Sequence, residues 1–517
     1  MARTPRTTTI LLCLAALSAS LSTTGCRVND TDVKRWETTE LGPTKLVAVI
    51  THDKYEWPLR TDAAMALVRM KPRAGRRIGI GKLQEAVASL PAADRAKLVA
   101  NLAPLLVKEI DKPPVAQQGV AEQKGGDPSI PFKDAAYALV SYDKAALVTD
   151  EAVKKTLTDA LIRWATADFD RRIAISSQLY NIEQIFRFIG ADAGRALPPL
   201  VKPDSAFDRM TALVAEIGDP PTKDKMAQAL VALGQYTEGQ EWFTKNKQRV
   251  KEANETAGYK VADDKLDLQT KDYQEEQVTK VFAALKKVGG RPAVEYLLGV
   301  GGDKAKPPKR REAALAALDG RLDRSNPNDA ARVIEIAKAD ETPDAVRQQA
   351  FSRAAEFPRD SVAPKLYEIV TAKDQKKWKV RWVAASTVLK LSQAANLPEF
   401  YTKLPPGPAA GFAMSEPVTY GDIIGKMTPP PKKEDWLAQA KDPQLSKALV
   451  AFGYFYSHGR AADVPAMQAM EADARALPKV EDGDGKWQCP APKEMKDMAN
   501  VGEFVKYCVI PAMQARK

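Results

Sequence analysis

The chain offers few side chains that could catalyse a reaction. It contains two histidines, His52 and His458, roughly four hundred positions apart. Each falls near the expected end of a helix, where the helix dipole stabilises a protonated imidazole. No serine lies in a G-x-S-x-G elbow and no H-E-x-x-H occurs. The sequence therefore favours structural roles for both histidines and predicts no catalytic residue, metal site or cofactor. A Ser-His-Asp triad built on His458 remains an alternative.

Basic clusters with neighbouring aromatic residues are a second possible source of binding chemistry. They lie at Arg73–Arg77, Lys304–Arg311 and Lys376–Arg381, the last interleaved with Trp378 and Trp382. Cations beside aromatic rings can bind sugars or nucleic acids. We favour a solvated face whose tryptophans fill gaps between helices, with an anionic polymer as the alternative ligand. The formal charge of +11 is modest for 517 residues and gives no argument for nucleic acid.

A short pattern recurs in the middle of the chain and indicates which elements carry these residues. A basic residue is followed three and seven positions later by small or apolar residues, which lie on one face of a helix. The arginines of the three clearest copies are 36 and 34 residues apart. These copies are Arg311, Ala314, Leu318; Arg347, Ala350, Ala354; and Arg381, Ala384, Val388. A helical repeat of this period predicts an α-solenoid of stacked helical pairs.

Looser copies of the pattern extend toward the N-terminus. Their basic residues are Arg60, Arg95, Lys133 and Arg172, spaced by 35, 38 and 39 positions. Such triplets also occur by chance in amphipathic helices, so the regular spacing is the stronger argument. Apolar residues make up 44% of the chain and aromatic residues only 7%, and the alternation typical of strands is nearly absent. The expected fold class is all-α.

Two of these segments resemble the second helix of HEAT repeats. Val346–Arg347, with Asp344 before it and Ala350 after it, is similar to the acidic residue and V-R-x-x-A phrase that open this helix. The segment that begins at Trp378 matches through Val380–Arg381 and Ala384, but it lacks the acidic residue. The resemblance implies a protein-binding scaffold. We predict partner contacts on a ridge near Arg347, Trp378 and Arg381.

The N-terminus resembles the leader of a bacterial lipoprotein. Arg3 and Arg6 precede an apolar run, Ile10–Leu21, that is too short to span a bilayer. Small residues then lead to Cys26, which resembles the lipidated cysteine of a lipobox, although Thr23 replaces the usual leucine. Ordinary cleavage near Ser18–Ser20 is the alternative. The resemblance implies an envelope protein held in the membrane by its lipid. The residue after the cysteine is Arg27 and not aspartate, which resembles the sorting signal of lipoproteins in the outer membrane.

The two cysteines outside the leader and lipobox lie near the C-terminus. Cys489 and Cys508 are nineteen positions apart, and in an exported protein such a pair favours a disulfide. A redox or metal-binding pair is the alternative, but there is no C-x-x-C spacing and no histidine nearby. The bond would close a loop of about 20 residues and contribute on the order of 3 kcal/mol.

These patterns divide the chain into five parts. We expect a signal peptide at 1–25, a lipid-anchored tether at 26–44, the HEAT-like solenoid at 45–403, a proline-rich connection at 404–434 and a helical cap at 435–517. Within the solenoid, the charged segments 238–254 and 270–288 predict an inserted helical hairpin.

The predicted function is a membrane-anchored, non-enzymatic scaffold that binds an unknown protein of the bacterial cell envelope. The predicted location is the periplasmic side of the outer membrane. A binder of anionic envelope glycopolymer is the alternative, and an enzyme that depends on His458 is a third reading.

Overall fold

The computed structural model describes residues 28–73, 76–114, 127–175, 180–372, 378–405, 419–478 and 498–516. In these segments the structure is helical, apart from isolated bridges between Arg73 and Arg76 and between Ala476 and Asn500. The helices pack as successive pairs, so the chain is an all-α solenoid of HEAT-like pairs, as the sequence predicts. The contacts divide it into two compact units, residues 1–222 and 223–517.

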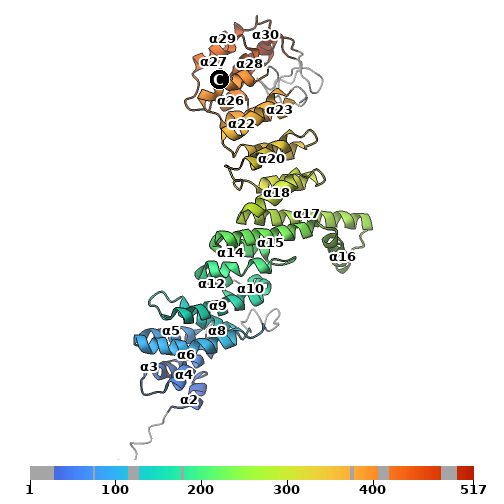
Figure 1. Cartoon of the computed structure of the whole chain (residues 1–517). Coiled ribbons are helices and arrows are strands. Elements are labelled where there is room, and N and C mark those ends of the chain that lie inside the picture. The colour runs from blue at the N-terminus through green and yellow to red at the C-terminus, as the bar shows by residue number, and fades with distance from the viewer. Residues whose placement is uncertain are drawn as a thin grey trace, which may run out of the picture. The chain divides into compact units, whose positions relative to one another are not determined.

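Unit 1 is built from helices that pack against their neighbours in sequence (Figure 1). The pair α3 and α4 packs on α5 and α6, and α6 packs in turn on α8 and α9. Three shorter helices, α12, α13 and α14, contact one another. The helices of unit 1 are α2 (Asp30–Trp36), α3 (Gly42–Thr51), α4 (Trp57–Arg69), α5 (Ile78–Ser89), α6 (Ala92–Ile110), α8 (Ile130–Val140), α9 (Glu151–Ala167), α10 (Phe169–Ile175), α12 (Ile182–Ile189), α13 (Ala191–Arg195) and α14 (Phe207–Ile217).

The segment expected to be a tether contains a folded helix, which corrects that prediction for residues 28–44. Helix α2 begins after Asn29, which forms a capping box with Asp32. Its Val33 and Trp36 are buried, and the helix packs against α3 and α4. Two apolar side chains at this spacing cover the end of the first pair, so the solenoid begins about fifteen residues earlier than the predicted position 45.

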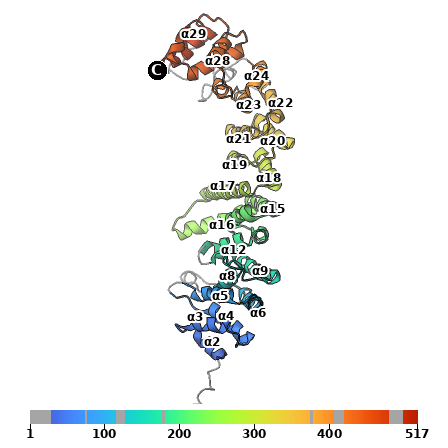
Figure 2. The same ribbon diagram turned by 90° about the vertical axis from the view of Figure 1, so that its left-hand side faces the viewer.

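Unit 2 contains the most regular part of the solenoid. First helices α18, α20 and α22 stack on one another, and second helices α19, α21 and α23 form a parallel stack (Figure 2). We call α19, α21 and α23 the second-helix layer. The bounds are α15 (Pro220–Glu238), α16 (Gln240–Thr256), α17 (Asp263–Val288), α18 (Arg291–Gly302), α19 (Pro308–Ala317), α20 (Pro327–Lys338), α21 (Asp344–Ala354), α22 (Arg359–Thr371) and α23 (Trp378–Leu391).

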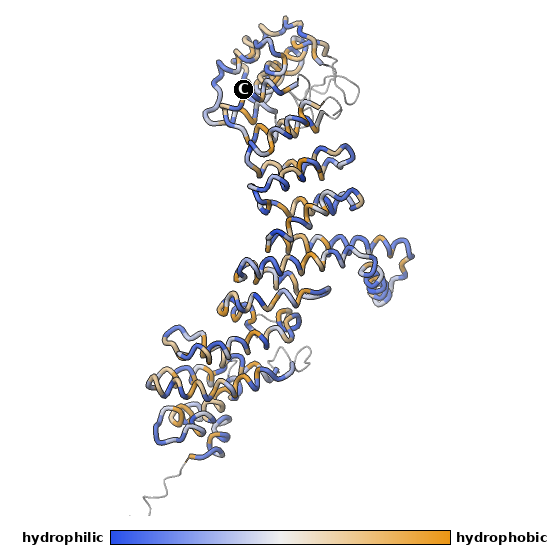
Figure 3. Tube along the Cα trace, in the orientation of Figure 1, coloured by the Kyte–Doolittle hydropathy of each residue, from blue (hydrophilic) through white to orange (hydrophobic). Residues whose placement is uncertain are grey.

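The predicted hairpin is present as α16 and α17. The second half of α17 packs on α19, whereas its first half contacts α16. Helix α16 and this first half of α17 form an arm that stands away from the other helices of unit 2 (Figures 1 and 2). The arm is largely hydrophilic (Figure 3). Between residues 240 and 270 the buried side chains are Trp242, Asn246, Leu266 and Thr270, so the two helices of the arm share a narrow contact.

The last part of unit 2 packs around one apolar helix, α28 (Leu445–His458). Its Leu449, Phe452 and Phe455 are buried, and it contacts α26 (Tyr420–Ile424), α27 (Lys433–Ala440) and α31 (Ile510–Gln514). Short helices α24 (Leu397–Lys403), α29 (Val464–Gln468) and α30 (Val501–Phe504) complete this part, with a π-helical turn at Val505–Val509.

Candidate functional site

The arginine proposed as a partner contact lies inside the fold. The Arg347 side chain is only 4% exposed. Its Nη2 donates hydrogen bonds to the carbonyls of Ala339 at 2.9 Å, Asp340 at 3.3 Å and Thr342 at 2.9 Å, which all belong to the turn between α20 and α21. Burial lowers the pKa of Arg347, and the three carbonyls compensate part of that desolvation. Arg347 therefore closes the turn before its own helix.

The same arrangement explains the basic residue of the repeat pattern. In each case a guanidinium near the start of one helix donates to a carbonyl at the end of the helix before it. The final carbonyls of a helix have no hydrogen-bond partner within the helix and carry partial negative charge. A guanidinium there supplies both the missing donor and a favourable positive charge. The pairs are Arg60 with Ile50, Arg95 with Ala88 and Leu90, Arg172 with Trp164, Arg311 with Gly301, Arg347 with Ala339, and Arg381 with Ala372.

Lys133 is the exception in this series. Its Nζ donates to the carbonyl of Tyr180 at 2.9 Å, farther along the chain, and pairs with Asp134 at 2.6 Å. The side chain is fully buried, and desolvation lowers its pKa while Asp134 partly opposes that shift. Arg381 follows the general pattern, donating to Ala372 at 2.6 Å. The side chain of Trp378 lies outside the described residues.

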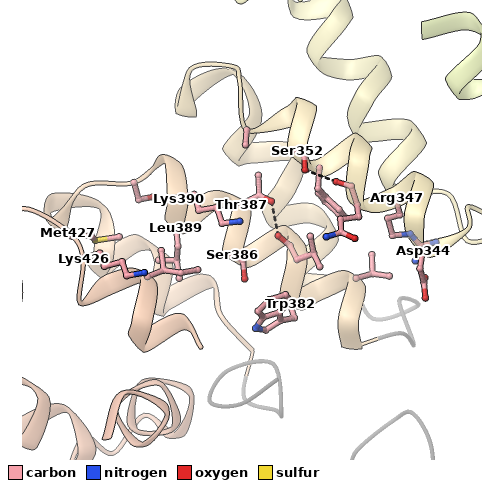
Figure 4. Close-up of a pocket in the computed structure, with 17 residues that line it drawn as sticks. Asp344, Arg347, Ser352, Trp382, Ser386, Thr387, Leu389, Lys390, Lys426 and Met427 are labelled. Carbon is pink, nitrogen blue, oxygen red and sulfur yellow. Dashed lines mark hydrogen bonds between the residues drawn. The ribbon is translucent and has the colours of Figure 1, made fainter. Parts of the chain in front are cut away.

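A cavity of about 740 Å³ lies beside Arg347, between α21, α23 and α26. One wall is formed by α23, where Trp382, Ser386 and Leu389 lie in succession, and Figure 4 shows Arg347 at one end and Lys426 at the other. The full lining is Asp344, Arg347, Gln348, Phe351, Ser352, Ala355, Val380, Trp382, Val383, Ser386, Thr387, Leu389, Lys390, Ser392, Ile423, Lys426 and Met427.

Three lining residues hold buried polar atoms that have no hydrogen-bond partner. These atoms are Nε1 of Trp382, Oγ of Ser386, and Nε and Nη1 of Arg347. The three side chains are 9%, 3% and 4% exposed. Buried polar groups in folded proteins are nearly always paired, and leaving one unpaired costs about 1–3 kcal/mol. Their concentration around one cavity makes it the strongest candidate site in the described part of the chain.

His458 does form an acid–base cluster, but not the catalytic triad that the sequence left open. Its Nε2 lies 2.5 Å from Oδ1 of Asp422, and Ser457 donates its hydroxyl to Oδ2 of the same carboxylate at 3.2 Å. A triad needs the serine hydroxyl on the free nitrogen of the histidine. Here Ser457 and His458 both bind Asp422, so the Ser457 hydroxyl is held by the carboxylate and not by the imidazole. His52 is the residue after α3 and pairs with exposed Asp53.

The structure offers little else for chemistry. Across the described ranges, no group of three or more His, Cys, Asp or Glu side chains could hold a metal ion. None of the helices described above is both long and apolar enough to cross a bilayer. Cys26 and Cys489 lie outside the described residues, so the lipid attachment and the disulfide remain predictions. Cys508 is described and its side chain is fully buried.

Comparisons with known proteins add little beyond this geometry. No family model matches the sequence, and no curated protein matches it either. Among solved structures, a crystal structure of a Kap121p mutant matches with 13% identity and a TM-score of 0.23. That match covers 89% of this chain, which spans about half (53%) of the Kap121p chain. The solenoid assignment therefore rests on the stacking of this chain's own helices.

Proposed function

We propose that this chain is a non-enzymatic protein-interaction scaffold, anchored by a lipid on Cys26 in the bacterial cell envelope, on the periplasmic side of the outer membrane. The observation that supports the scaffold is the second-helix layer. Its three helices stack over three successive pairs, and stacked repeats of this kind form the extended surfaces with which solenoids bind partners. The sequence of the first 27 residues supports the anchor.

We move the contact face proposed from the sequence from Arg347 to exposed residues of the same helix. Arg347 and Arg381 each donate hydrogen bonds to backbone carbonyls that close the preceding turn. Truncating either side chain would therefore test the fold and not the interface. Gln348 and Ser352 are the exposed residues of α21 on the C-terminal side of Arg347. They lie on one helix face, four positions apart, and we place the partner contact there.

A cross-linking pull-down from envelope extracts tests the scaffold. The variant carries Gln348→Arg and Ser352→Arg, and its matched control carries Asn328→Arg on α20 and Ser361→Arg on α22, which are also exposed and add the same charge. We expect the α21 variant to lose proteins that the wild type and the control both retain. Identical protein sets from all three would refute the α21 face as the contact.

Metabolic labelling with palmitate tests the anchor. The wild type should incorporate label and fractionate with membranes, whereas a Cys26→Ser variant should do neither, because the thiol is the acylated group. Stable anchoring also needs more than one acyl chain, so the mass of the purified wild type should exceed that of the cleaved chain by several acyl groups. An unlabelled wild type excludes the anchor without affecting the scaffold.

A further inference from the structure

The cavity between α21, α23 and α26 has the size and composition of a ligand site. Sites for small organic molecules are usually about 300–1,000 Å³ and mostly apolar, with a few polar groups that fix orientation. This cavity measures about 740 Å³. Its apolar lining comes from all three helices and the segments next to them, and includes Phe351, Val383, Leu389, Ile423 and Met427.

The buried polar groups without a partner at this cavity can all donate a hydrogen bond. The indole Nε1 of Trp382 and the guanidinium nitrogens of Arg347 can only donate, and both residues hold buried N–H groups without a partner. The hydroxyl of Ser386 is also buried and unpartnered and can donate as well. An excess of donors calls for a ligand that presents acceptors.

The charges at the cavity have the same bias. Arg347, Lys390 and Lys426 are cationic, and Asp344 is the one acidic residue in the lining, which leaves an excess of two positive charges. Lys390 and Lys426 are exposed. Neither forms an ion pair with another side chain in the described segments, whereas Lys433 pairs with Asp463 and Lys447 pairs with Asp442. Free cations at the mouth of an apolar cavity favour an anion.

We propose that this cavity binds an organic anion, a carboxylate carried on an apolar body. The carboxylate supplies acceptors for Lys390, Lys426 and the buried donors of Ser386 and Trp382, and the apolar body fills the space between Ile423 and Phe351, toward the end where Arg347 lies. A free inorganic anion would leave the apolar lining uncovered, and a neutral apolar molecule would leave the donors unpaired. Charge-assisted hydrogen bonds to a carboxylate are roughly twice as strong as neutral ones.

Calorimetric titration of decanoate into the full chain tests this site. A Cys26→Ser background avoids detergent, which would compete for the cavity. Decan-1-ol has the apolar body without the charge, and acetate has the charge without the body. We expect one decanoate per chain, with decan-1-ol and acetate each binding at least about tenfold more weakly.

Substitutions at the mouth separate this site from nonspecific adsorption. Lys390→Gln with Lys426→Gln should weaken decanoate binding about tenfold or more, and should leave decan-1-ol binding unchanged. The matched control is Lys338→Gln with Lys365→Gln, two exposed lysines of α20 and α22 that do not line the cavity. The control should bind decanoate as the wild type does.

Ser386→Ala gives a readout that a merely structural role would not produce. Removing a buried hydroxyl without a partner should raise the thermal midpoint of the free protein. If that hydroxyl serves the ligand, the same change should weaken decanoate binding. Trp382→Phe keeps most of the ring and should also weaken binding. Equal affinity for decanoate and decan-1-ol, several equivalent decanoates per chain, or unchanged affinity in the Lys390→Gln/Lys426→Gln variant would each overturn the proposal.

Discussion

Arg311 donates the N–H of its Nε to the carbonyl of Gly301, 3.0 Å away, across the turn between α18 and α19. The donor is 4% exposed, and burial lowers its pKa. Equivalent bonds close five other turns, from Arg60 in α4 to Arg381 in α23. With the exception of Lys133, the basic residue of the repeat pattern thus helps to join the two helices of its pair.

Arg311→Met should destabilise unit 2 because it leaves the Gly301 carbonyl without its donor. A buried hydrogen bond from a charged group contributes about 1.5–3 kcal/mol, and urea unfolding followed by circular dichroism should show a loss of that order. Arg324→Met, at an exposed position in the next turn, should change the free energy of unfolding by less than about 0.5 kcal/mol. Equal effects of the two changes would contradict the proposed role of Arg311.

Two glycines of α5 should respond to alanine in opposite directions. A Cβ at Gly79 would lie 2.1 Å from the carbonyl oxygen of Leu67, whereas a Cβ at Gly81 would meet nothing within 4 Å. Gly79→Ala should therefore cost about 1–3 kcal/mol by forcing α4 and α5 apart. Gly81→Ala should stabilise by about 0.5–1 kcal/mol, because alanine loses less backbone entropy in a helix. Thermal unfolding of the two variants checks both signs, and a stabilising Gly79→Ala would show that the helices do not approach this closely.

Asp219 should make the stability of unit 1 fall in acid. Hydrogen bonds from Thr222, and then from Arg195, hold the pKa of its carboxyl at about 2, below the ordinary 3.8. A depressed pKa in the folded state stabilises the protein above the unfolded value, and this stabilisation is lost as the pH falls from about 4 to about 2.

Urea unfolding at pH 6, 4 and 2 measures this effect. Asp219→Asn should be less stable than the wild type at pH 6 and should match it more closely at pH 2. Asp143→Asn, which changes an exposed carboxyl in a loop, should preserve the wild-type pH dependence. An Asp219→Asn profile parallel to that of the wild type would rule out the pairing.

The predicted Cys489–Cys508 bond can be tested by thiol labelling. Maleimide added to the denatured, unreduced mature protein should leave both cysteines unmodified, and reduction should expose two thiols. Cys489→Ala should lower the free energy of unfolding by about 3 kcal/mol, since the bond closes a loop of about 20 residues. Free thiols before reduction would favour the redox or metal-binding alternative.

The sequence predicts the helical pairs because their apolar positions recur at helical spacing. The small and apolar residues that follow Arg60, Arg311 and Arg347 are buried as that spacing requires. Spacing does not reveal where a long side chain turns, however. A guanidinium that begins an apolar stripe can reach outward to a partner or back to the preceding helix, and only the turn geometry decides between them.

The cavity could not be predicted from sequence because its walls come from Asp344 to Met427, over three separate elements. No short motif joins those residues. Helix α2 is difficult to predict for a different reason, because its sequence does contain helix signals. Asn29 and Asp32 have capping-box spacing, and Val33 and Trp36 have helical spacing, but seven residues of helix within a polar segment give a weak periodic pattern.

The closure of six turns by an arginine from the same helical pair bears on how such a chain can evolve. Gly301 and Arg311 lie ten positions apart, so one short stretch of gene carries both donor and acceptor. Duplication or loss of a whole pair would then leave no carbonyl orphaned at the junction. The length of the protein can change in steps of one repeat, while each remaining repeat of this kind keeps the hydrogen bond between its arginine and its own turn.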